Sequence, residues 1–169
     1  MKRRCGALIV AIVILLGLVS GPALADAAYP GDPGTVSAED TVWDLTAGAA
    51  VLPTCQGDRG EYQGLKIDAM SGKFAPREGD TQVNGGTVLY VPVAAEEQGA
   101  TLLLSGNNHG NLTVTLNGDP IQVGSETALP DLEASAYLEL VFSGEGSCYL
   151  TGITVDYFCD TPQAEPNAV

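Results

Sequence analysis

From Thr41 onward, the sequence is built from short apolar or alternating runs separated by glycine, asparagine and aspartate. In the run LTVTL at 112–116, leucine and valine alternate with threonine, and the run LELVF at 138–142 has a large apolar residue at every second position. This alternation indicates half-buried β-strands, because successive side chains of a strand point to opposite faces of the sheet. Strands must therefore account for most of the chain.

The segments between the runs carry turn residues. Asn-Gly-Gly at 84–86 and Asn-Gly-Asp at 117–119 tolerate the positive φ angles that tight hairpins require. No segment shows a sustained helical apolar period bounded by helix caps. We therefore predict an all-β fold, an antiparallel β-sandwich with a jelly-roll-like strand order; an immunoglobulin-like order and a closed barrel are less favoured alternatives. The expected strands lie in TVWDL (41–45), YQGLKIDA (62–69), TQVN (81–84), TVLYVPV (87–93), ATLLLSG (100–106), LTVTLNG (112–118), AYLELVFSG (136–144) and CYLTGITVDYF (148–158).

Residues 1–25 have the layout of a secretory signal peptide. Basic residues at 2–4 precede an apolar run at 7–19, and Ala-Leu-Ala at 23–25 forms a small-x-small cleavage site. An uncleaved membrane anchor is the alternative, which the short apolar run and Pro22 disfavour. We predict cleavage at this site and an extracellular protein.

The remaining chain is predicted to form one domain between two tails. Residues 26–40 are polar and rich in proline and glycine, which is typical of a flexible leader. Residues 41–159 contain all the expected strands and have the size of a single domain with its own core. Residues 160–169 contain no apolar run and are expected to form a disordered tail.

The chain is strongly acidic, with 21 acidic and 7 basic residues. Signal cleavage would remove three basic residues and no acidic ones, so we expect neither nucleic acid nor, after that cleavage, a membrane as a partner. The four remaining cations, Arg59, Lys66, Lys73 and Arg77, lie close together in the sequence. Their grouping predicts one surface suited to an anionic or polar ligand.

Three cysteines follow the predicted signal peptide. Cys148 and Cys159 flank a strand-like run, YLTGITVDYF, that would hold them beyond disulfide reach. In an exported protein we therefore predict a disulfide between Cys55 and either Cys148 or Cys159.

Metal-binding and catalytic signals are weak. Asp44 and Asp156 lie in the first and last expected strands. We favour solvent-facing positions for both aspartates and consider them weak candidates for a structural calcium site. Trp43, next to Asp44, is expected to anchor the core. No other cofactor is expected. His109 is the only histidine and lies in SGNNHGN, which is expected to be a solvated turn. Without a nucleophile motif or a distinguished pair of carboxylates, we predict a non-catalytic protein, with a polysaccharide lyase or esterase as a disfavoured alternative.

The segment GKFAPREGDTQVNGGT, residues 72–87, combines the residue types that bind sugars. Lys73 and Arg77 flank Phe74, and Gln82 and Asn84 would share one face of a strand. An aromatic ring can pack against a sugar ring, amides can bind hydroxyl groups, and cations can bind uronate carboxylates. We predict a carbohydrate-binding surface formed by Lys73, Phe74, Arg77, Gln82 and Asn84.

Residue spacing alone supports a purely structural role of the same segment as well as it supports carbohydrate binding. Phe74 would then belong to the core, and the cations would pair with Asp68, Glu78 and Asp80 at the surface. The corresponding alternative function is a structural or adhesive extracellular β-sandwich that binds other proteins.

The runs TVWDL, CQGDRGEYQGLKIDAMSGKFAPREGDTQVNGGTVLYVPV and CYLTGITVDY together resemble a β-sandwich module of secreted bacterial proteins that degrade polysaccharides. Such modules are often attached to pectate lyases or pectin esterases. The resemblance implies an accessory, non-catalytic, carbohydrate-associated domain for pectic or other cell-wall polysaccharides. It suggests a binding role for Lys73, Arg77, Gln82 and Asn84, and a separate enzyme or surface protein as a partner.

Overall fold

The structure is a computed structural model that describes residues 28–95 and 99–157, and within these ranges it contains only β-strands and turns. In this part of the chain there is no helix long and apolar enough to cross a membrane. The predicted signal peptide, Cys159 and the predicted tail lie outside the described residues. The strands are β1 (Thr41–Asp44), β2 (Arg59–Tyr62), β3 (Leu65–Asp68), β4 (Phe74–Pro76), β5 (Thr81–Asn84), β6 (Val88–Val93), β7 (Ala100–Gly110), β8 (Thr113–Leu116), β9 (Asp119–Ile121), β10 (Glu126–Ala128), β11 (Ala136–Ser143) and β12 (Gly146–Tyr157).

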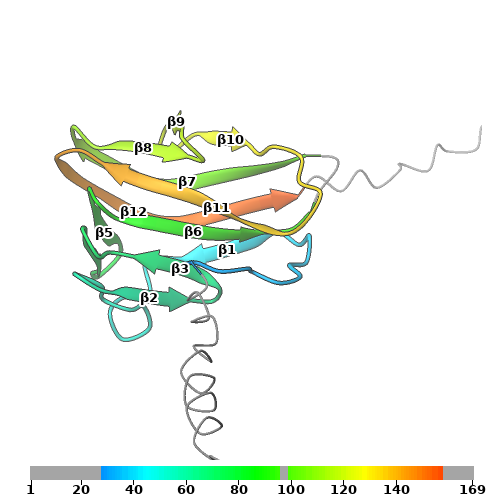
Figure 1. Ribbon diagram of the computed structural model, residues 1–169. Coiled ribbons are helices and arrows are strands. Elements are labelled where there is room, and N and C mark those ends of the chain that lie inside the picture. The colour runs from blue at the N-terminus through cyan, green and yellow to red at the C-terminus, as the bar shows by residue number, and fades with distance from the viewer. Residues whose placement is uncertain (1–27, 96–98, 158–169) are drawn as a thin grey trace, which may run out of the picture. The chain divides into compact units, whose positions relative to one another are not determined.

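The strands form two antiparallel sheets (Figure 1). The first sheet has the order β10-β7-β12-β5-β4, with β1 also pairing with β12. The second sheet has the order β2-β3-β6-β11-β8-β9. The predicted all-β sandwich is confirmed, whereas the jelly-roll strand order stays a prediction.

The two longest strands of the first sheet, β7 and β12, pair with each other along their whole length. Their register runs from Gly146 opposite Gly110 to Tyr157 opposite Ala100, with one irregularity between Leu150 and Gly152. Along the other edge of β12, its first half pairs with β5 and its second half with β1. The predicted turn SGNNHGN is therefore wrong for the most part, because β7 continues as a strand through His109 to Gly110.

The alternation that identified the strands also defines the core. Leu138, Leu140 and Phe142 on β11 are all buried, while Glu139 between them is exposed. Trp43 is buried as expected, and its indole Nε1 donates a hydrogen bond of 3.0 Å to the carbonyl oxygen of Gln63. Burial of these side chains from both sheets is the main favourable contribution to folding.

Of the two predicted hairpin turns, Asn117–Gly118 is a hairpin between the paired strands β8 and β9, whereas the prediction is wrong for residues 84–86, which lead from β5 of the first sheet to β6 of the second. Asn117 and Gly118 have φ angles of 49° and 92°, which gives the β8–β9 turn the left-handed pair that two-residue hairpins favour. In the turn after β5, the amide of Thr87 donates to the carbonyl oxygen of Asn84 at 3.3 Å, and Gly86 has a φ of 88°. These turns connect strands whose polar side chains are described below.

Part of the predicted leader contacts the sandwich. The amide of Val36 donates a hydrogen bond of 3.0 Å to the Ser135 hydroxyl, and Val36 packs against the core. The Asp40 carboxylate accepts a hydrogen bond of 2.9 Å from the amide of Tyr157. Residues 36–40 thus help to close the sandwich beside the last strand.

The predicted pairing of Cys55 with Cys148 is wrong. Both are buried free thiols. In the sheet, the backbone of Cys55 lies opposite Phe74, Phe74 lies opposite Val83, and Val83 lies opposite Cys148. Three strand spacings therefore separate the two cysteines. Three spacings amount to about 14 Å, twice what a disulfide can span between Cα atoms. The alternative with Cys159 falls outside the described residues.

Burial of Cys148 predicts a loss of stability at alkaline pH. Desolvation raises the pKa of this thiol from 9.0 to about 11, so the folded state keeps its proton where the unfolded state has lost it. The free energy of unfolding should therefore fall as the pH rises from about 9 to about 11, by at most roughly 2 kcal/mol. Urea denaturation at several pH values measures this change. Cys148→Ala should remove this part of the decline, and an identical pH dependence in both proteins would contradict the assignment.

Candidate functional site

Polar side chains gather on the outer face of the first sheet, where β4, β5, β12 and β7 lie side by side. Tyr149 of β12 pairs with Gln82 of β5 on one side and with Asn107 of β7 on the other. Its neighbours Cys148 and Leu150 are fully buried, so Tyr149 points away from the core. The three residues form one row across the outer face.

A second row lies beside the first. Ser147 pairs with Asn84 on β5 and with His109 on β7. The Gln82 amide nitrogen donates to Asn84 Oδ1 at 3.0 Å and to the Ser147 hydroxyl at 3.1 Å, and that hydroxyl donates to Asn84 Oδ1 at 3.0 Å. These bonds fix the orientation of both amides. We call this surface the Tyr149 face and define it by Arg77, Gln82, Asn84, Asn107, His109, Ser147 and Tyr149.

Arg77 reaches the Tyr149 face from the loop between β4 and β5. Its guanidinium carbon lies 4.6 Å from the centre of the Tyr149 ring, and its Nε lies 3.0 Å from Asp80 Oδ1. Asp80 therefore holds the guanidinium over the ring, where an exposed cation–π contact contributes about 0.5–1 kcal/mol. His109 meets the same ring edge-on, with 5.3 Å between the ring centres. Tyr149 is thus the centre of the cluster.

Lys73 lies at the margin of this face. It precedes Phe74, whose side chain points into the core, so Lys73 belongs to the outer side of the sheet. Its carbonyl oxygen accepts a hydrogen bond of 3.0 Å from the amide of Asn84. Among the cations of residues 28–95 and 99–157, Lys73 is the one whose side chain forms no ion pair. Its ammonium group is therefore the one most available to a ligand.

Thr87 fixes the backbone of Lys73. Its buried hydroxyl accepts a hydrogen bond of 2.9 Å from the Lys73 amide and donates one of 3.1 Å to the Lys73 carbonyl oxygen. Thr87→Val should lower the free energy of unfolding by about 1–3 kcal/mol, since both backbone groups lose a partner. Thr87→Ser keeps the hydroxyl and should retain most of the stability. Equal losses for the two variants in urea denaturation would show that the hydroxyl has no such role.

The prediction that Phe74 belongs to the binding surface is wrong. Its side chain is fully buried, because adjacent residues of a strand face opposite sides and Phe74 faces the second sheet. The aromatic ring that faces outward on this surface is the half-buried Tyr149, which the sequence prediction missed together with Asn107 and Ser147. The sequence signal that could have placed Tyr149 on the outer face is its position between the apolar residues Cys148 and Leu150 in a strand-like run.

The four cations do not form one basic surface. Arg59 and Lys66 lie on β2 and β3 of the second sheet, where Arg59 pairs with Asp68 at 2.9 Å and Lys66 pairs with Glu61. Only Arg77 and Lys73 belong to the first sheet. The expected grouping of all four cations is therefore wrong, and half of them have a structural role on another surface.

Asp44 and Asp156 cannot share a calcium ion. Asp44 pairs with Gly152, four residues from Asp156 along β12, which corresponds to about 13 Å. The carboxylate of Asp44 instead accepts hydrogen bonds from the Thr46 hydroxyl at 2.6 Å and the Thr46 amide at 2.9 Å, which lower the pKa of Asp44. No group of three or more His, Cys, Asp or Glu side chains that could hold a metal ion occurs within the described ranges.

The chemistry of the Tyr149 face is that of polar recognition. It offers a phenol ring, amides and an imidazole, with one unpaired ammonium at its margin. Comparisons with protein-family models, curated proteins and solved structures find no match to this chain. The resemblance to accessory modules of pectin-degrading proteins therefore stays a hypothesis.

Proposed function

We propose that this protein is a secreted, non-catalytic carbohydrate-binding module that holds a cell-wall polysaccharide, such as a pectic polymer, on the Tyr149 face. The observation that carries the proposal is the row of Gln82, Tyr149 and Asn107 beside the hydrogen-bonded group of Gln82, Asn84 and Ser147. Amide groups held in fixed orientations can exchange hydrogen bonds with sugar hydroxyls, and an aromatic ring can contact the apolar side of a sugar. Strands rather than loops carry most of these groups, which favours a pre-formed site.

Charge narrows the class of polysaccharide. Arg77 is already paired with Asp80, and Lys73 is the one unpaired cation of this surface. The rest of the chain is strongly acidic, with a formal net charge of −14 over all 169 residues. A fully ionised polyuronate would be repelled by most of the protein surface outside the Tyr149 face. We therefore propose a ligand with sparse carboxylates, such as methyl-esterified pectin, in preference to polygalacturonate.

A retention assay on immobilised polysaccharides tests this function. The panel should contain methyl-esterified pectin, polygalacturonate, xylan and a β-glucan, each at low and moderate salt. Retention on at least one of them, strongest on esterified pectin, is the expected result. Arg77→Ala and Lys73→Ala should weaken it, whereas Arg59→Ala, which removes the same charge from the second sheet, should not.

A structural or adhesive protein that binds other proteins is the competing function. It predicts no retention on any polysaccharide of the panel by a protein that is folded according to circular dichroism. It also predicts no difference between Arg77→Ala and Arg59→Ala in that assay. Either result would remove the support for carbohydrate binding.

A further inference from the structure

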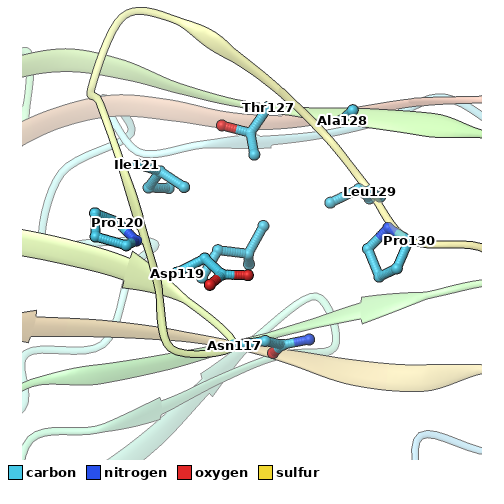
Figure 2. A pocket seen from close by; sticks show the side chains of 9 residues that line it. Asn117, Asp119, Pro120, Ile121, Thr127, Ala128, Leu129 and Pro130 are labelled. Atoms are coloured by element: carbon cyan, nitrogen blue, oxygen red, sulfur yellow. The ribbon is translucent and has the colours of Figure 1, made fainter.

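A cavity at the open edge of the sandwich is separate from the Tyr149 face. It lies between β9, an edge strand of the second sheet, and β10, an edge strand of the first (Figure 2). Its volume is about 370 Å³, within the range of roughly 300–1,000 Å³ that is typical of small-molecule sites. Leu116, Ile121 and Leu129 supply apolar walls, and Pro120 and Pro130 stand on opposite sides in Figure 2. The cavity can therefore accept an apolar body.

A carboxylate faces into this apolar space. Asp119 pairs directly with Leu116 across the β8–β9 hairpin, and residues paired in this way point to the same face of a sheet. Leu116 is 6% exposed and belongs to the core, so Asp119 lies on the core-facing side of β9, where its side chain stays exposed to solvent at the edge of the sandwich. Figure 2 shows Asp119 among the apolar side chains of the cavity. In the described parts of the chain, its carboxylate has no hydrogen-bond or ion-pair partner.

A hydroxyl group faces the cavity from the other sheet. Thr127 of β10 pairs with Leu102, which is fully buried, so Thr127 also points inward. Its hydroxyl can accept a hydrogen bond from a ligand or donate one. The two edge strands thus bring one anionic and one neutral acceptor to the same cavity.

Within residues 28–95 and 99–157, no lysine or arginine forms an ion pair with Asp119. The sequence has no lysine or arginine after Arg77. The same half of the chain contains further acids near the cavity in sequence, including Glu126 and Asp131. A ligand's positive charge would therefore meet a uniformly negative field at this edge.

We propose that this cavity binds an alkylammonium group, a short aliphatic stem that ends in a primary ammonium, such as a lysine side chain. The stem would pack against Leu116, Ile121 and Leu129, and the ammonium would donate hydrogen bonds to Asp119 and Thr127. An inward-pointing charge on an edge strand also discourages pairing with another chain. Preventing edge pairing would require only the charge of Asp119, and it would not explain the cavity or the hydroxyl of Thr127 opposite that charge.

Titration of the protein with Nα-acetyl-lysine methylamide, followed by amide chemical shifts at low salt, tests the proposal. Saturable shifts confined to the β8–β9 turn and β10 are expected. The matched probe Nα-acetyl-norleucine methylamide has the same stem without the ammonium and should bind at least about tenfold more weakly, because hydrogen bonds to a carboxylate from a charged donor are strong.

Two variants locate the charge that matters. Asp119→Asn should weaken lysine binding at least about tenfold and leave norleucine binding unchanged. Glu126→Gln removes the same charge on the neighbouring strand, but Glu126 pairs with the outward-facing Leu103 and so points away from the cavity; this variant should bind as the original protein does. Equal binding of both probes, shifts scattered over the acidic surface, or equal effects of the two variants would overturn the proposal. Should Asp119→Asn fail to fold, the comparison of the two probes on the original protein decides the question.

Discussion

Gly106→Ala should be among the most destabilising single substitutions in this protein, with a loss of about 3 kcal/mol or more in the free energy of unfolding. Gly106 has a φ of 140°, a conformation that costs other residues about 1–3 kcal/mol. A β-carbon at this position would also lie 2.8 Å from the Cα of Leu150, and closer still to the carbonyl oxygen of Tyr149. Backbone displaced by overpacking typically adds about 1–3 kcal/mol.

The physical reason lies in the pairing of β7 with β12. Gly106 lies opposite Leu150, where the register of the two longest strands shifts, and the backbones approach closely there. A side chain would separate the strands next to Tyr149. Gly124→Ala is the matched control, because Gly124 also has a positive φ, 85°, but has open space around the missing β-carbon. It should lose only about 1–2 kcal/mol. Equal losses in urea denaturation would show that strand approach is not the cause.

Phe74→Ala is the second large effect, with an expected loss of about 3–5 kcal/mol. Phe74 is fully buried between Cys55 and Val83 on the inner side of the first sheet, so its removal leaves a cavity in the core. Val42→Ala on β1 should change the stability by less than about 0.5 kcal/mol, since Val42 is 61% exposed. Urea denaturation of both variants measures the difference.

Phe74→Ala also tests whether Phe74 is a core residue or a ligand-binding residue. A ring that contacted sugar at the surface would reduce binding when removed and leave the stability nearly unchanged. Phe74→Leu fills most of the space and should lose less than half as much stability as Phe74→Ala. A Phe74→Ala protein with the stability of the original one would contradict the burial of this ring.

The sequence identified the strands whose side chains alternate over several residues. The runs around Val88–Val93 and Ala136–Ser143 satisfy this condition and were correctly predicted. β2, β4, β9 and β10 have the sequences RGEY, FAP, DPI and ETA, in which large apolar residues do not alternate with polar ones. They form because a neighbouring strand offers hydrogen-bonding partners, which is a tertiary effect.

The candidate site could be predicted only where it is local. Gln82 and Asn84 share a face because they are two positions apart in one strand. The same rule excludes Lys73 and Phe74 from one surface, and its application to this pair would have prevented the error at Phe74. Tyr149 joins the site through the pairing of β12 with β5, and the hydrogen bond from Gln82 to Ser147 connects residues 65 positions apart. No local pattern specifies such a register.

Chemical-shift mapping can show whether a polysaccharide binds on the Tyr149 face. Amide and side-chain chemical shifts should be followed during titration with oligosaccharides from methyl-esterified pectin. We expect saturable changes at Gln82, Asn84, His109 and Tyr149, and their loss in Tyr149→Ala. Saturable changes that cluster on the second sheet, or no change up to millimolar oligosaccharide, would contradict this expectation.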